Sequence, residues 1–315
     1  MSIVEKARGR WTPLLKHFGI DFKVKRHGPC PICGGKDRFI VDDKEGLGTF
    51  HCNQCGAGTG FTLLQKVKGW DMKQTMLEVS KIVGGMSKME IKPELSDEQR
   101  RKALNEVWTG ARDITDDDPA YSYIYKRTGL RDMPKTLRYH AGLYHPDARV
   151  NIPAIVAKVT DLDNRPVSIH RTFITAEGEK AKVERPKMLM QGSLPEGAAI
   201  RLFPYQDALG ITEGIETAIS CFAIFGIPTW AAISAAMLVK WTPPPVVKRV
   251  YVFGDNDDNF TGQLAAYRLG WKLNNEKSLD IVRVVVPEIR GADWNDVLTL
   301  HGSVAAREMV KGKLE

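Results

Sequence analysis

Cys30-Pro-Ile-Cys33 and Cys52-Asn-Gln-Cys55 form two C-x2-C pairs that are separated by eighteen residues. A structural zinc ion takes four ligands in a tetrahedron, and each C-x2-C turn supplies two thiolates to such a site. Gly34-Gly35 and Gly56 follow the second cysteine of each pair, where a tight turn often needs a positive φ angle. The spacing favours a four-cysteine zinc ribbon over disulfides or an iron site.

The surroundings of the four cysteines are basic. Residues 1–86 contain 14 Lys and Arg against 8 Asp and Glu, so this region carries +6 of the chain's net charge of +7. Such an excess on a small zinc ribbon favours contact with a phosphate backbone, and a plain solvated surface is the alternative. Because four thiolates already fill a tetrahedral site, we expect His51 to be a neighbour or a nucleic-acid contact.

The overall composition is that of a globular protein. The chain has 315 residues, 43% of them hydrophobic, which predicts two or three structural units. We expect a protein without a membrane span, because no apolar run is long enough, and without a signal peptide at residues 1–5. Cys221 lies in the apolar run 218–224 and is expected to be buried.

Hydrophobic periodicity divides the chain into two patterned regions. Residues 86–95 have few apolar anchors and predict a linker, and Ser96 with Gln99 predicts a capped helix start. For the first region we expect a helix over 4–18, a strand over 22–27, the ribbon over 29–60 and helices around 61–67 and 76–83. For the second region we expect helices over 119–126 and 260–273 and strands over 155–159, 167–173, 209–212, 227–233, 249–254 and 281–286.

Strands that alternate with helices in this second region predict a buried parallel sheet, whose functional groups gather at the carboxyl ends of the strands. Acids follow three of these strands: Glu213, then Asp255 and Asp257, then Asp293 and Asp296. Carboxylate oxygens suit Mg²⁺ or Mn²⁺. Each acidic motif alone is more often a solvated surface feature, but acids after successive apolar strands favour a metal site.

Three segments together resemble the Toprim domain, in the variant of phage- and plasmid-type DNA primases. They are residues 211–218 (ITEGIETA), 253–257 (FGDND) and 293–298 (DWNDVL). The ribbon with residues 34–39 (GGKDRF) resembles the zinc-binding domain at the front of those primases. The resemblance covers nearly the whole chain in the family's order. No P-loop pattern occurs, so no fused helicase is expected.

The resemblance implies an α/β protein in four parts. These are a zinc-ribbon DNA-binding domain over 1–86, a linker over 87–99, a mixed α+β N-terminal subdomain of the primase core over 100–205, and a Rossmann-like Toprim subdomain over 206–315. It also implies a DNA primase, a nucleotidyltransferase with DNA-directed RNA polymerase activity. Such an enzyme would make short RNA primers on single-stranded DNA from ribonucleoside triphosphates, for phage, prophage or plasmid replication in the cytosol of a bacterial host.

The resemblance further implies the cofactors, a partner and the site residues. Zinc would be structural and Mg²⁺ or Mn²⁺ catalytic, and a separate replicative helicase would be a partner. The implied catalytic residues are Glu213, Asp255, Asp257 and Lys187, the last within the basic motif of residues 185–189 (RPKML). The implied metal ligands are Cys30, Cys33, Cys52 and Cys55 for zinc, and Glu213, Asp255, Asp257, Asp293 and Asp296 for magnesium. The implied DNA contacts are Lys36, Arg38, Phe39 and His51.

Two positions depart from the family pattern. Thr217 stands where many Toprim proteins have an acid, and Glu216 lies one place earlier. The alternative to a functional role for Glu216 is that of an exposed residue on the first turn of a helix, stabilised by the helix dipole. Asp293 and Asp296 are spaced more widely than is common.

Two other functions remain open at this stage. One is a Toprim nuclease, because the same acids serve hydrolysis, whereas a topoisomerase would need a further large domain with a tyrosine. The other is a zinc module that binds DNA or a replication partner and is attached to a core that has lost its activity. The presence of Glu213, Asp255 and Asp257 argues against such a loss.

Overall fold

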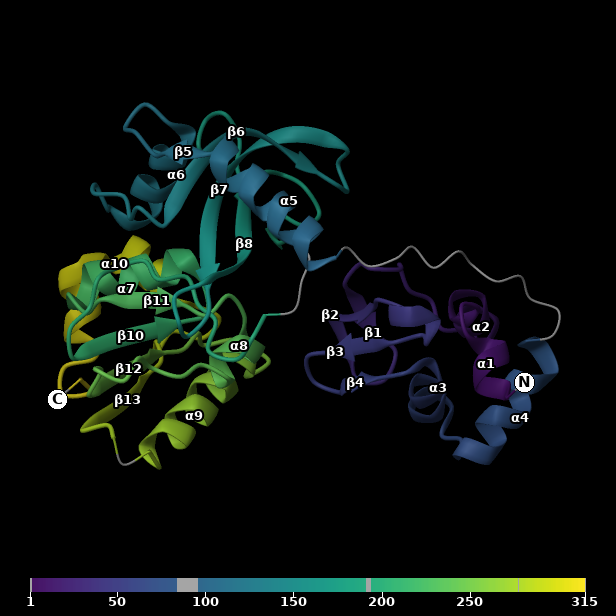
Figure 1. Ribbon diagram of the computed structural model, residues 1–315. Coiled ribbons are helices and arrows are strands. Elements are labelled where there is room, and N and C mark those ends of the chain that lie inside the picture. Colours follow the sequence, from purple (N-terminus) through teal and green to yellow (C-terminus); the bar gives the residue numbers. More distant parts are fainter. Residues whose placement is uncertain (1, 84–95, 191–193, 277, 315) are drawn as a thin grey trace. The chain divides into compact units, whose positions relative to one another are not determined.

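The computed structural model describes residues 2–83, 96–190, 194–276 and 278–314 (Figure 1). The chain divides into two compact units, Met1–Glu94 and Leu95–Glu315. The linker predicted over 86–95 lies outside the described residues. Among the helices of the described ranges, none is long and apolar enough to cross a membrane.

The first unit is a small antiparallel sheet closed by helices. Its strands pair in the order of the chain: β1 (Gly28–Cys30), β2 (Gly34–Val41), β3 (Phe50–Cys52) and β4 (Gly56–Gly58). Its helices are α1 (Ile3–Ala7), α2 (Trp11–His17), α3 (Gly60–Lys68) and α4 (Met72–Val83), with a 3-10 turn, η1 (Lys44–Gly46), between β2 and β3. The predicted helices around 61–67 and 76–83 are therefore confirmed.

The core of this unit is built around the buried indole of Trp11. The ring of Phe61 packs edge-on against it, with the ring centroids 4.6 Å apart. Gly60 begins α3 directly over the indole, and a Cβ atom at Gly60 would lie 2.1 Å from Trp11 Cε3. Only glycine allows α2 and α3 to approach this closely.

Two sequence-based predictions for this unit were wrong. The single helix expected over 4–18 is broken at Gly9, whose φ is 74° and whose amide donates to the carbonyl of Gly46 at 2.8 Å. The strand expected over 22–27 forms only one bridge, from Val24 to Val41. Lys25, next in the chain, has a φ of 56°, which is incompatible with an extended strand.

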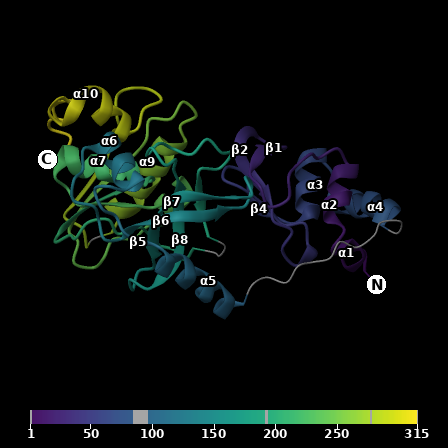
Figure 2. The ribbon, with the colours of Figure 1, turned by 90° about the horizontal axis from the view of Figure 1, so that it is seen from above.

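The second unit begins with an antiparallel sheet. Its strands are β5 (Arg112–Asp113), β6 (Leu137–His145), β7 (Val150–Thr160), β8 (Pro166–Phe173) and β9 (Lys187–Leu189), paired in chain order (Figure 2). Helices α5 (Asp97–Gly110) and α6 (Pro119–Thr128) accompany it, and Ser96 and Gln99 form the predicted capping box of α5. Strand β6 was missed because an irregular register between His140 and Leu143 interrupts its alternation of buried side chains.

A parallel sheet follows, as the sequence predicts. Its strand order is β11 (Thr229–Ala231), β10 (Ala208–Thr212), β12 (Arg249–Phe253) and β13 (Ile281–Val285). Helices α7 (Ile215–Phe225) and α10 (Trp294–Glu308) cover one face, and α8 (Ala235–Val239) and α9 (Thr261–Asn274) cover the other (Figure 1). Cys221 is fully buried under α10, as expected.

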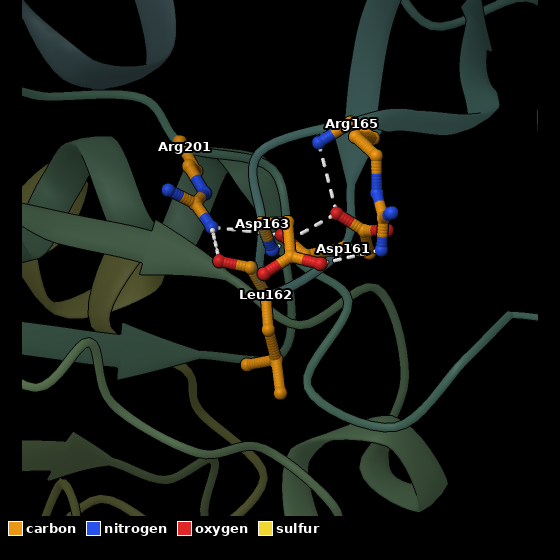
Figure 3. Close-up of polar contacts among 5 residues, drawn as sticks. All are labelled: Asp161, Leu162, Asp163, Arg165 and Arg201. Carbon is orange, nitrogen blue, oxygen red and sulfur yellow. Dashed lines mark hydrogen bonds and ion pairs between the residues drawn. The ribbon is translucent and has the colours of Figure 1, made fainter.

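A short segment joins the two sheets of the second unit. Ala199 bridges to Thr160 of β7, and the next residue, Ile200, bridges to Ala231 of β11. Arg201 then donates from one guanidinium nitrogen to the carbonyl oxygens of Asp161 and Leu162, at 2.7 and 3.0 Å (Figure 3). These contacts tie the turn between β7 and β8 to the segment and so fix the antiparallel sheet against the parallel one.

Candidate zinc ribbon and acidic site

The four cysteines of the first unit converge as the spacing predicts. Their Sγ atoms all lie within 4.8 Å of one another, with Cys30 and Cys55 at 3.9 Å and Cys33 and Cys52 at 3.8 Å. Thiolates about 2.3 Å from a tetrahedral zinc ion lie about 3.8 Å apart, so this geometry fits zinc, whereas a disulfide would need about 2.05 Å. The glycines that follow Cys33 and Cys55 have positive φ angles of 82°, 56° and 80°.

The residues predicted to contact DNA from this unit occupy different environments. Lys36 and His51 are exposed on the ribbon, and the guanidinium of Arg38 donates to the side chain of Gln54. Phe39 is only 1% exposed and packs against Phe50 in the core. A DNA contact for Phe39 therefore does not fit the structure, because its ring is not accessible for stacking.

In the second unit, the parallel sheet brings three groups of acids to one edge. Glu213 follows β10, and Asp255 and Asp257 follow β12, which is paired with β10. Asp257 Oδ2 accepts a hydrogen bond from the amide of Gly262 at 2.8 Å. A Cβ atom at Gly262 would lie 2.7 Å from the carbonyl oxygen of Asp255, so glycine is required for this close turn.

A cavity of about 180 Å³ lies at this edge. Its lining includes Glu213, Asp255, Asp293, Lys187 and His170. Burial, then the nearby carboxylates of Glu213, Asp293 and Asp257, raise the pKa of Asp255 to about 8. Burial and Asp257 raise the pKa of Glu213 to about 7.

The acidic edge has an unpartnered carboxylate oxygen and crowded negative charges, both of which a bound divalent cation would stabilise. Asp255 Oδ1 is buried and has no hydrogen-bond partner among the described residues. The raised pKa values reflect burial first and then the repulsion between the charged carboxylates, and a bound cation would offset both. The acids are less tightly grouped than the cysteines, which form the only cluster of three or more His, Cys, Asp or Glu residues with metal-binding spacing in the described ranges.

Asp293 and Asp296 have different positions. Asp293 caps α10, its Oδ1 accepting from the amides of Asn295 and Asp296 at 2.7 and 2.9 Å, while Thr217 donates to its Oδ2 at 3.3 Å. Asp296 is exposed and lines a different hollow, of about 550 Å³, beside Arg127 and Arg290. The structure therefore brings Asp293 but not Asp296 into the lining of the acidic cavity.

A buried ion pair lies next to the acids. Glu216, on α7, is 8% exposed, which rules out the alternative of an exposed residue on the first helical turn. Lys187 Nζ donates to its Oε2 at 2.8 Å and the Tyr123 hydroxyl donates to its Oε1 at 2.7 Å. Burial acts to raise the pKa of Glu216, but Lys187 and Tyr123 outweigh it and lower this pKa to about 2.

Two residues of this site were missed from the sequence. Tyr123 belongs to α6, and His170, on β8, is buried against the cavity, where desolvation and Lys187 lower its pKa to about 4. A lone tyrosine or histidine in a patterned element carries no local signal. Their contacts reach across the chain, Tyr123 and Glu216 being 93 residues apart.

Comparisons with known families cover three regions of the chain. Residues 25–61 match the zinc-binding domain of primase-helicase, residues 208–304 match the Toprim domain, and residues 98–202 match a domain of unknown function. None of the three matched descriptions is that of a helicase domain.

Solved structures of primases also match. The zinc-binding and RNA polymerase domains of the Aquifex aeolicus primase are 16% identical, with 99% of this chain and 85% of that chain covered and a TM-score of 0.44. The primase fragment of the bacteriophage T7 primase-helicase is 14% identical, with 92% and 98% covered and a TM-score of 0.39. At these values the likenesses do not decide the function.

The fold and the two named family matches define the class. The first unit contains a primase-type zinc ribbon, and the second contains a Toprim domain whose parallel sheet carries the acids. The chain therefore combines a primase-type zinc ribbon with a Toprim domain, and this combination supports the function of a DNA primase in DNA replication.

Proposed function

We propose that the protein is a nucleotidyltransferase that makes short RNA primers on a single-stranded DNA template from ribonucleoside triphosphates. The observation that carries this proposal is the crowding of Glu213, Asp255 and Asp293 around one cavity, with a buried Asp255 oxygen that lacks a partner. In the reaction, a 3′-hydroxyl oxygen bonds to the α-phosphorus of the incoming nucleotide, the bond from that phosphorus to the β-phosphate bridge breaks, and pyrophosphate leaves.

Glu213, Asp255 and Asp257 are the proposed ligands of Mg²⁺ or Mn²⁺, and Asp293 lies where it can add to them. When bound, such ions neutralise the triphosphate and polarise the α-phosphate. Lys187 lines the same cavity and is the proposed contact for a phosphate of the nucleotide or template. As an alternative to metal binding, Glu213 is a candidate general base for the proton of the 3′-hydroxyl.

The zinc ribbon is the proposed template-binding module. Lys36, Arg38 and His51 would contact the DNA backbone, because they lie on a unit with a large basic excess. The domain limits predicted from the sequence place a linker between the ribbon and the core. Such a linker would allow the ribbon to present the template to the core. A separate replicative helicase in the bacterial cytosol is the proposed partner.

One experiment tests the proposal. The protein is incubated with single-stranded DNA, labelled ribonucleoside triphosphates and Mg²⁺ or Mn²⁺, and short labelled products are expected. If the wild-type protein degrades the template instead of copying it, the nuclease function replaces the primase function, because the same acids would then serve hydrolysis.

A further inference from the structure

Glu216 differs from the other acids of the site in the kind of partner it has. Its two carboxylate oxygens accept hydrogen bonds from different parts of the chain, Oε1 from Tyr123 at 2.7 Å and Oε2 from Lys187 at 2.8 Å. Asp255, in contrast, has a buried oxygen without a partner among the described residues. The charge of Glu216 is therefore already balanced by the protein.

The three residues come from three separate elements. Tyr123 lies on α6, Lys187 begins β9, and Glu216 lies in the first turn of α7, three residues after Glu213. The hydroxyl of Tyr123 is itself buried, so this network holds the carboxylate of Glu216 in one place. The contacts thus connect the part of the unit that precedes the Toprim domain with the Toprim domain itself.

We propose that Glu216 is a positioning residue that aims the ammonium of Lys187 at the acidic cavity, where it meets a phosphate of the incoming nucleotide. This inference rests on the proposed function. A lysine side chain is flexible, so an ammonium without a fixed partner would occupy many positions. An ammonium has three N–H donors, and Glu216 engages one of them, which leaves donors for phosphate oxygens.

The competing role for Glu216 is that of a metal ligand. The two roles predict different effects on nucleotide binding and on Mg²⁺ dependence when Glu216 is replaced by an uncharged residue. Glu216→Gln keeps the volume of the side chain and removes its charge, so as a positioning residue it should weaken nucleotide binding through Lys187. As a metal ligand it should instead raise the Mg²⁺ concentration needed for half-maximal activity.

The test measures primer synthesis against nucleotide and Mg²⁺ concentration. For Glu216→Gln we expect the nucleotide KM to rise by about tenfold, because one charge-assisted hydrogen bond is lost. The kcat and the Mg²⁺ concentration for half-maximal activity (the Mg²⁺ midpoint) should stay nearly unchanged. Tyr123→Phe keeps the ring and should raise KM by a smaller factor. Adding Glu216→Gln to Lys187→Met should cause no further loss, because both changes act through one ammonium.

The matched control is Glu288→Gln. Glu288 pairs with Lys313 at the same 2.8 Å, but on the surface, and its substitution should leave KM and the Mg²⁺ midpoint unchanged. A shifted Mg²⁺ midpoint with an unchanged KM in Glu216→Gln, or losses that add fully in the double variant, would overturn the positioning role.

A second readout separates this inference from the proposed function. Binding of a fluorescent ATP analogue with Mg²⁺ is measured on the same variants, whether or not primers are made. If the wild-type protein makes no primers but binds the analogue, and Glu216→Gln and Lys187→Met both weaken binding, the proposed function fails while the positioning role stands. If the wild-type protein does not bind the analogue, the positioning role is wrong.

Discussion

The two candidate metal sites of this protein are built in opposite ways. The four cysteines are complete within 26 residues of sequence, and local turns bring their sulfur atoms to 3.8 and 3.9 Å. The acids are spread along the sequence between Glu213 and Asp293, and the parallel sheet brings them to one edge. Their carboxylate oxygens do not lie as close together as the four sulfur atoms do. We expect the first unit to need its metal in order to fold, whereas the second unit, with its own buried core, should fold without one.

This difference predicts which unit should depend on its metal for stability. A small ribbon buries little apolar surface, so zinc binding supplies much of its folding free energy. The parallel sheet has its own buried core on both faces. There the charged acids oppose folding, since Asp255 and Glu213 ionise less readily in the folded chain.

The largest expected effect follows from removing a zinc ligand. Cys30→Ser should unfold the first unit and leave the second folded, because structural zinc contributes about 10–16 kcal/mol in small domains. The measurements are elemental analysis, with about one zinc per chain in the wild-type protein, and thermal unfolding followed by circular dichroism. Cys221→Ser, outside the ribbon, is the control and should keep its zinc. Freshly purified protein with no zinc or iron would contradict this prediction.

Removing a carboxylate at the acidic edge should have the reverse effect on stability. Asp255→Asn should abolish primer synthesis, yet raise the metal-free thermal midpoint of the second unit, by about 2–4 °C for each kcal/mol of repulsion relieved. Glu213→Gln should act in the same direction. Asp258→Asn is the control, because Asp258 is exposed and pairs with Arg290. If the Asp255→Asn variant makes primers at the wild-type rate, the acids at the end of β12 do not take part in catalysis.

The pH dependence of stability should also distinguish the units. The raised pKa values of about 7 and 8 mean that folded Glu213 and Asp255 keep protons that the unfolded chain releases near pH 4. Without divalent metal, the second unit should therefore lose stability as pH rises from about 4 to 8. Saturating Mg²⁺ should flatten this fall. The zinc unit should instead weaken on acidification, because protons compete with zinc for the thiolates.

Urea titrations at a series of pH values, read separately for each unit, provide the measurement. Asp255→Asn supplies the control, since it removes the group with the higher pKa and should reduce the slope. Stability of the metal-free second unit that rises through this window would contradict the burial of these carboxylates.

The smallest expected effects concern template binding by the ribbon. Lys36→Ala should weaken binding to single-stranded DNA modestly and reduce the salt slope by about 0.7, the value for one lost phosphate contact. Fluorescence anisotropy over a range of salt concentrations measures this slope, and Lys313→Ala, on the other unit, is the control. A fragment that begins at residue 95 should show a shallower slope than the full chain. Equal slopes would show that the ribbon does not carry template binding.

Much of the fold followed from local patterns. The cysteine spacing predicted the ribbon, the Ser96 and Gln99 pair predicted the start of α5, and apolar runs predicted β10 and β12. Predictions failed where a distant contact overrode the pattern. Gly9 breaks the first helix because its amide bonds to Gly46, and Phe39 turns inward because its strand faces the core.

The sequence by itself determined which chemistry is present: two thiolate pairs, acids after apolar strands, and the order of the two domains. These features depend on neighbouring residues, whose geometry is set by turns and by strand periodicity. Only the tertiary structure decided which acids share a cavity, that Asp296 lies elsewhere, and that Glu216 is buried against Lys187 and Tyr123. Those relations join residues many tens of positions apart, and they exist only once the packed sheets bring their ends together.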